Sequence, residues 1–192
     1  MPRELERMVG DVKWAKAHRF PPRELAAMLR RLVAAAPEGS EERRFARVEL
    51  ASMLLESDPW LAARMASDAL RCREDERTWS VLGIAHTLLG HYRSALRAHR
   101  RALELAPLSP EHEHNLGHLL DVAFNRPLSA VPHLRRALRG APDEPEIKSS
   151  LSHALCRVGR RREAERLLIE VFSGDRARAQ ATLASWLGES AP

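Results

Sequence analysis

A large apolar residue followed by a small one recurs three times at nearly equal intervals in this chain. Leu82-Gly83 is followed by Leu116-Gly117 and then by Leu151-Ser152, with a spacing of about 34 residues. A period of this length is typical of supersecondary units that cannot bury their apolar faces alone and must stack on one another. The sequence therefore predicts an array of stacked repeats.

Each repeat reads as a pair of helices. Ala, Leu, Arg and Glu dominate, and these are strong helix formers. No segment alternates apolar and polar residues as a half-buried strand would. Ser57-Asp58-Pro59, Ser109-Pro110 and Asp143-Glu144-Pro145 place a capping residue before a proline at a helix start. Gly90 and Gly159 follow apolar segments, as glycines just past a helix end do. We expect an all-α protein of short antiparallel helices.

The segment 76–109 carries the most specific pattern. Its marker residues are Trp79, Leu82, Gly83, Gly90, Tyr92, Ala95, His99, Ala102 and Pro107. This pattern resembles the tetratricopeptide repeat, whose unit is a helix–turn–helix. The resemblance implies a right-handed superhelix (solenoid) of antiparallel helix pairs, with about four to five hairpins and a C-terminal capping helix.

The other copies are more degenerate. We expect a degenerate or capping N-terminal helix pair at about 1–41. Four repeats follow, at about 42–75, 76–109, 110–144 and 145–172, and residues 173–192 are expected to form a C-terminal capping helix with its tail. The repeat after Pro110 is one residue longer, with the extra residue near Asn125. There Ser129 is predicted to cap the second helix, which would put Pro132 in the first turn, where proline is tolerated. The loop 125–129 is then expected to protrude.

The resemblance implies a function in protein–protein interaction, since this family usually holds a peptide or helix on the face lined by the first helix of each pair. The chain would be a non-enzymatic adaptor or scaffold within a larger assembly. The residues that this implies for the partner-binding groove are Arg77, Ser80, Ile84, Glu111, His114, Asn115, His118, Asp121, Ser149, His153 and Arg157. The Lys/Arg clamp with which some members grip a C-terminal carboxylate is absent, and the mixed groove favours a polar or basic peptide.

Three histidines in this groove support an alternative interpretation. His114 and His118 are one helical turn apart, and His153 lies at the position equivalent to His118 in the next repeat. Imidazoles gathered in this way can bind zinc. The zincin pattern H-E-x-x-H is not met, because Asn115 stands where the glutamate is required. A metal-binding module is therefore a weaker hypothesis than a polar groove, and no cofactor is predicted.

Paired arginines in the second helices support another alternative. They form a possible basic ridge on the convex side, made of Arg97, Arg100, Arg101, Arg135 and Arg136. Such a ridge could bind nucleic acid or another polyanion, or it could be a solvated helix face. Of the 31 basic residues only three are lysines, and the formal net charge is a modest +5. Because an arginine bias can reflect genome composition, it is weak evidence for phosphate binding, and nucleic acid is the disfavoured partner.

Composition excludes several further classes. The two cysteines cannot build a disulfide framework and fit a reducing compartment, so we expect a cytoplasmic protein. No apolar run is long enough to insert into a membrane. No nucleophile elbow or glycine-rich phosphate loop is present, and an enzyme is not expected. The oligomeric state and the identity of the partner protein stay open.

Overall fold

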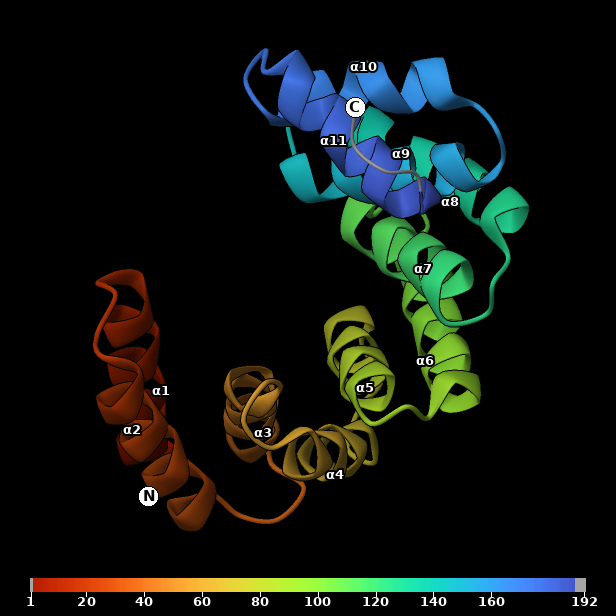
Figure 1. Cartoon of the computed structure of the whole chain (residues 1–192). Coiled ribbons are helices and arrows are strands. Elements are labelled where there is room, and N and C mark those ends of the chain that lie inside the picture. The colour runs from red at the N-terminus through yellow and green to blue at the C-terminus, as the bar shows by residue number, and fades with distance from the viewer. Residues whose placement is uncertain (1, 189–192) are drawn as a thin grey trace. The chain divides into compact units, whose positions relative to one another are not determined.

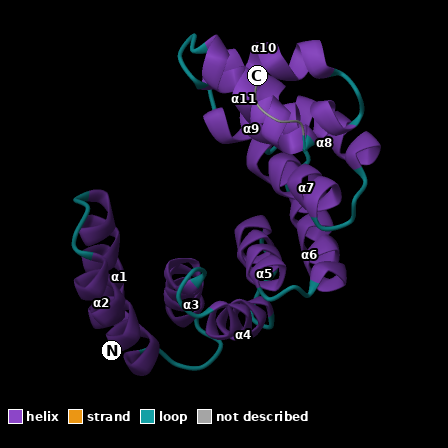
Figure 2. Cartoon of the chain, viewed as in Figure 1, coloured by secondary structure: helices purple, strands orange, loops and turns teal. Residues whose placement is uncertain are grey.

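The computed structural model describes residues 2–188, which form helices joined by short turns (Figure 1). Figure 2 shows no strand in this part of the chain. The helices are α1 (Pro2–Ala17), α2 (Pro22–Ala35), α3 (Glu41–Leu54), α4 (Pro59–Leu70), α5 (Glu76–Leu88), α6 (Tyr92–Leu105), α7 (Pro110–Val122), α8 (Pro127–Gly140), α9 (Pro145–Arg157), α10 (Arg161–Val171) and α11 (Arg176–Leu187). The prediction of an all-α fold is confirmed. Of the predicted C-terminal segment, residues 189–192 lie outside the described residues.

The helices pack as sequential antiparallel pairs, as predicted. The chain divides into two compact units, the first ending at Leu105 and the second beginning at Ala106. Within the first unit each helix from α1 to α6 packs on the next, and α3 also contacts both α1 and α5. Within the second unit α7 to α11 pack in the same sequential way, and α9 also contacts both α7 and α11. The first helices of neighbouring pairs therefore lie side by side within each unit.

Most of the predicted helix boundaries have the expected chemistry. The Asp58 carboxylate accepts a hydrogen bond from the backbone N–H of Leu61, and the Ser109 hydroxyl accepts one from His112. Glu144 occupies the N-cap position of α9 but its side chain makes no capping bond. Gly90 and Gly159 have φ of +72° and +80°, a conformation that glycine adopts without a steric penalty.

The predicted start of α8 is wrong. The helix begins at Pro127, preceded by Arg126, so Ser129 lies inside the first turn and does not cap it. Pro132 therefore falls within the helix and not in its first turn. Proline at the first helical position is already set to a helical φ, which explains the earlier start. The turn between α7 and α8 is correspondingly shorter than predicted and contains Asn125 in a left-handed conformation at φ +54°.

Small residues set the distance between paired helices. A Cβ placed on Gly117 of α7 would lie 2.7 Å from Cγ of Leu134 in α8. On the facing helices Ala95, Ala102 and Ala130 are fully buried. The small residues predicted at these positions thus allow the close helix packing that the repeat requires.

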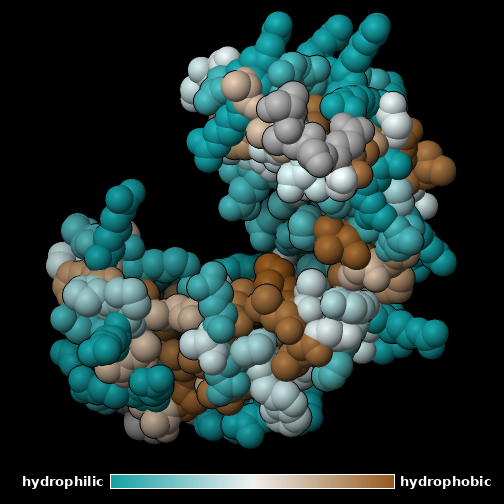
Figure 3. All heavy atoms as spheres, in the orientation of Figure 1, coloured by the Kyte–Doolittle hydropathy of each residue, from teal (hydrophilic) through white to brown (hydrophobic). Residues whose placement is uncertain are grey.

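Leucine, valine and alanine fill the cores. In the first unit, Leu29, Leu32 and Leu50 pack together where α2 meets α3. In the second unit, Leu134, Leu155 and Leu168 are almost completely buried. Figure 3 shows that hydrophobic residues also gather on the visible surface over α5. No helix among the described residues is long and apolar enough to cross a bilayer.

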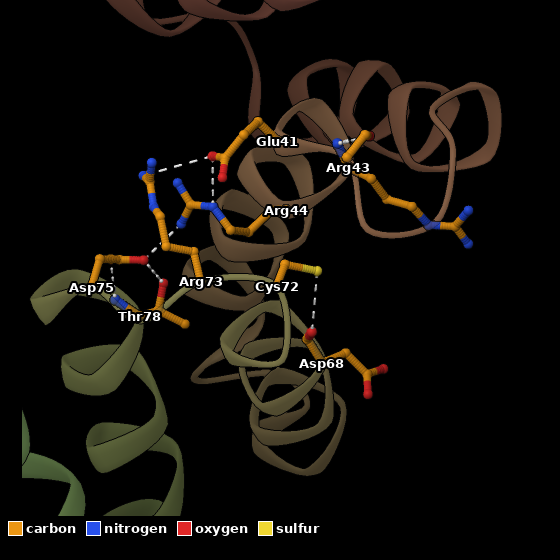
Figure 4. A network of polar contacts seen from close by, with 9 residues as sticks. Glu41, Arg43, Arg44, Asp68, Cys72, Arg73, Asp75 and Thr78 are labelled. Atoms are coloured by element: carbon orange, nitrogen blue, oxygen red, sulfur yellow. Dashed lines mark hydrogen bonds and ion pairs between the residues drawn. The ribbon is translucent and has the colours of Figure 1, made fainter.

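A polar network fixes the start of α5 (Figure 4). The Asp75 carboxylate accepts hydrogen bonds from the backbone N–H of Thr78 at 2.9 Å and from its hydroxyl at 2.7 Å. Arg44 of α3 donates to the same carboxylate at 2.6 Å and to Glu41 at 2.9 Å, while Arg73 lies 3.6 Å from Glu41. A single aspartate therefore caps α5 and ties it to α3.

Candidate peptide-binding face

The first helices of two neighbouring pairs, α7 and α9, form a hollowed face in the second unit. The hollow has a volume of about 400 Å³ and is lined by His114, His118, Pro145, Glu146, Ser149 and Ser150. His114, His118 and Ser149 belong to the predicted groove. Glu111 and Asn115 lie on the same helix α7, exposed and half-buried respectively.

Ser150 joins the two histidines of this hollow. Its hydroxyl lies 2.9 Å from Nε2 of His114 and 3.3 Å from Nδ1 of His118. The imidazole rings are tilted with their centroids 6.0 Å apart. Because α9 supplies the serine and α7 supplies both rings, these hydrogen bonds also fix the two helices relative to each other.

Both imidazoles are held neutral at pH 7. Loss of solvation between the helices lowers the pKa of His114, and the neighbouring His118 lowers it further. Loss of solvation likewise lowers the pKa of His118, although the nearby Asp121 carboxylate acts in the opposite direction. A neutral imidazole offers one donor and one acceptor. The hollow therefore presents polar groups that can bind a peptide backbone without a net positive charge.

The Asp121 carboxylate organises the other end of this face. It lies 2.6 Å from Nδ1 of His153 and 2.6 Å from Nη1 of Arg157, both on α9. Arg157 also donates to the backbone oxygen of Asp121 at 2.7 Å and to the side chain of Asn125. The side chain of Asp121 is only 2% exposed. Asp121 and Arg157 thus neutralise each other, and the contacts of Asp121 fix the positions of His153 and Arg157 on this face.

The predicted groove residues of the first unit lie on α5. Arg77 makes an ion pair of 2.6 Å with Glu49 of α3, whose second oxygen binds Lys16 of α1 at 2.8 Å. These cations lower the pKa of the Glu49 carboxyl despite its burial, which acts in the opposite direction. Ser80 is buried and Ile84 is half-buried. Ile84 and the exposed part of Arg77 are therefore the accessible groups here.

The three histidines proposed as metal ligands do not converge. Nδ1 of His153 is directed at Asp121, and its ring packs edge-on against Trp186 of α11 at 5.1 Å. His114 and His118 are directed at Ser150 instead. No group of three or more His, Cys, Asp or Glu side chains within residues 2–188 has the arrangement of a metal site. In this arrangement the three imidazoles are engaged by side chains of the protein itself.

Glutamates compensate much of the predicted basic ridge. Arg101 pairs with Glu74 at 2.6 Å and with Glu104 at 3.0 Å. In the second unit Arg135 pairs with Glu163 at 2.9 Å, and Arg136 binds the buried Glu113. Arg97 donates to Ser94, and Arg100 is exposed. The structure thus gives little support to a continuous polyanion-binding surface on these arginines.

Sequence reasoning missed the residue that joins the hollow. Ser150 stands 35 positions after Asn115, which the resemblance had marked as a contact position, so the repeat register itself could have identified it. The buried carboxylate of Glu113, bound by Arg136 and by His133 at 2.6 Å, was also missed. Glu113 stands between two other polar residues of the same helix, so the sequence gives no sign that its carboxylate is buried.

Comparison with known proteins yields matches in structure and not in sequence. No protein-family model matches the chain, and no curated protein matches it. Solved structures of MamA do match. The structure of residues 41-end from Desulfovibrio magneticus RS-1 has a TM-score of 0.71 and 15% identity, covering 91% of this chain and 96% of that one. A MamA crystal structure has a TM-score of 0.67 and 15% identity, with coverages of 88% and 96%.

A third MamA structure, of AMB-1, has a TM-score of 0.64 and 17% identity, covering 90% of this chain and 92% of that one. At such identities the likeness concerns the fold alone. MamA is a tetratricopeptide-repeat protein, and the sequential helix pairs described above match its architecture. This chain therefore has a MamA-like tetratricopeptide-repeat fold.

Proposed function

We propose that this protein is a non-enzymatic scaffold that binds a segment of a partner protein on the face formed by α7 and α9. The observation that carries the proposal is the hollow in which Ser150 and two neutral histidines meet. Its polar groups come from two successive repeats, so an extended peptide or a helix lying across them would contact both. A repeat fold supplies such a surface without a deep catalytic pocket.

The partner segment is proposed to be polar or basic. Glu146 lines the hollow and lies close enough to His114 and His118 to raise the pKa of both imidazoles. The cation at this face, Arg157, is already engaged by Asp121. The charge left for a ligand is therefore negative, and a lysine or arginine of the partner would find a carboxylate there.

The cytoplasm is the proposed compartment. Both cysteines are free thiols in the described structure: Cys72 is exposed and Cys156 is buried. Free thiols persist where glutathione and thioredoxin keep the surroundings reducing.

The test is a pull-down with the tagged protein from a native lysate at low and at high salt, each with and without nuclease, and the retained proteins are identified by mass spectrometry. The His118→Arg variant places a positive charge in the hollow, which would repel a basic segment, and His91→Arg makes the same change at an exposed histidine of the first unit. We expect a small set of proteins that the wild type and His91→Arg retain and His118→Arg loses. Recovery only at low salt, or loss on nuclease treatment, would contradict the proposal and favour polyanion binding.

A further inference from the structure

A second hollow lies on the opposite helices of the second unit, between α8 and α10. Its volume is about 600 Å³. Each of these two helices packs on α9, and the ion pair between Arg135 and Glu163 joins the two to each other. Beside this pair, Leu151 and Leu155 of α9 line the floor of an open groove. This volume falls in the range of protein ligand sites.

The walls of the groove are two regular stripes. On α8 the lining residues are Arg135, Leu138 and Arg139, with Pro142 in the turn that follows the helix, and on α10 they are Glu163, Arg166, Leu167 and Glu170. The α10 set follows the spacing i, i+3, i+4, i+7 and the α8 set follows i, i+3, i+4, which places the members of each set along one face of a helix. The groove therefore extends for about two helical turns, or roughly 10 Å. Leucines line its inner part and charged side chains form its rim.

The rim carries an excess of positive charge. Glu163 is paired with Arg135 at 2.9 Å, and Glu170 is paired with Lys148 at 2.8 Å. Both carboxylates are therefore compensated by this chain itself. Arg139 and Arg166 are exposed, and neither makes an ion pair with the described residues. Two guanidinium groups, one on each wall, remain available for an anionic ligand.

We propose that this groove binds an amphipathic helical segment of another protein whose apolar stripe is flanked by Asp or Glu. Apolar anchors of such a helix, spaced like the walls, would cover Leu138, Leu167 and the leucine floor. Its flanking carboxylates would pair with Arg139 and Arg166, and arginine suits this because its planar fork binds a carboxylate bidentately. This site is separate from the face of α7 and α9 and requires the opposite charge in its ligand.

Nucleic acid fits the groove less well. Its floor is leucine, and no aromatic side chain lines it on which a base could stack. Glu163 and Glu170 on the α10 wall would also lie near the phosphates of a bound strand. The charge pattern and the apolar floor together favour an acidic amphipathic helix.

The experiment measures the fluorescence anisotropy of a labelled synthetic peptide about four turns long, with leucines at i, i+3, i+4 and i+7 flanked by glutamates. The comparison peptides have lysine in place of glutamate, or the same composition scrambled. The test variant is Arg139→Glu with Arg166→Glu. The matched control is Arg126→Glu with Arg176→Glu, which reverses two exposed arginines of the same unit outside the groove. Circular dichroism checks that both variants stay folded.

We expect the acidic peptide to bind the wild type, the control and His118→Arg alike. It should bind Arg139→Glu/Arg166→Glu about tenfold more weakly, because two pairs become two repulsions. The lysine and scrambled peptides should bind more weakly than the acidic one. The proposal is overturned if the acidic peptide does not bind, if the two double variants weaken it equally, or if a single-stranded DNA oligonucleotide displaces it from the arginines of the rim.

Discussion

The imidazole of His99 in α6 lies directly over the backbone of Gly83 in α5. A Cβ on Gly83 would come within 2.6 Å of Cε1 and Nδ1 of that ring. His99 is 2% exposed and belongs to the packed layer between the two helices. It occupies one of the marker positions of the 76–109 repeat, and its ring fills the space that the missing side chain of Gly83 leaves.

The Gly83→Ala substitution should therefore destabilise the protein. We expect a loss of about 1–3 kcal/mol, because the new methyl group forces a buried ring to move in a closely packed layer. Gly10→Ala is the matched control, since nothing lies within 4 Å of a Cβ on Gly10 in the middle of α1. That change should stabilise the protein by up to about 1 kcal/mol through helix propensity. Urea denaturation followed by circular dichroism measures both, and equal effects would show that Gly83 is not a packing residue.

The buried carboxylate of Glu113 should depend on Arg136. Arg136 donates to it from α8, and this guanidinium together with His133 lowers the pKa of the Glu113 carboxyl against the effect of burial. Arg136→Ala is expected to cost about 2 kcal/mol, less than for a fully buried pair because Arg136 is 42% exposed. Arg100→Ala, at an exposed position in the first unit, should change the free energy of unfolding by less than about 0.5 kcal/mol. A loss no larger than that of Arg100→Ala would mean that His133 alone compensates Glu113.

The two histidines of the hollow should make stability depend on pH. Their pKa values are lowered in the folded protein, so the unfolded chain binds protons more readily. Stability contributed by the neutral rings is present above the unfolded value of 6.5 and is lost as the pH falls below it.

The free energy of unfolding at pH 7.5 and 5.5 measures this effect, in a range where Glu49 and Glu113 with their lowered pKa values stay ionised. The wild type should lose more stability over this interval than the double variant His114→Gln/His118→Gln. An unchanged difference would assign the pH dependence to other groups, such as His86, whose pKa burial also lowers.

The N-cap residue of α5 should contribute more to the free energy of unfolding than the N-cap residue of α9. Asp75→Ala removes two hydrogen bonds to Thr78 and the partner of Arg44, and we expect a loss of about 1–2 kcal/mol. Glu144→Ala removes an N-cap residue whose side chain makes no capping bond, and its effect should be within about 0.5 kcal/mol. Thermal unfolding of the two variants beside the wild type checks the difference. Similar melting temperatures for both variants would contradict the role assigned to Asp75.

Local signals predicted the fold because each acts over a few residues. Prolines after Asp58 and Ser109, and glycines at 90 and 159, mark helix ends by backbone chemistry that operates in any context. The failure at Ser129 has the same origin. Ser129 and Pro127 both signal a helix start, and the structure shows that the helix begins at Pro127.

The site was predicted in part, because its contacts join separate helices. The register placed His114, His118 and Ser149 on one face, and the structure gathers them around one hollow. Spacing could not show that Asp121 would be buried against Arg157, since this depends on the packing of α7 against α9. Pairing across helices also explains why arginines that look like a ridge in the sequence are largely compensated.

The Glu49 carboxylate takes its two cations from helices on either side of it, Lys16 of α1 and Arg77 of α5. Shortening the chain from its N-terminus by the first helix pair would remove Lys16 and expose part of an apolar core, but Arg77 would stay. Removing this helix pair would therefore lower the stability of the array, but the buried carboxylate of Glu49 would keep an ion-pair partner. Because the two cations come from different helix pairs, the ionised state of Glu49 does not depend on the presence of either pair alone.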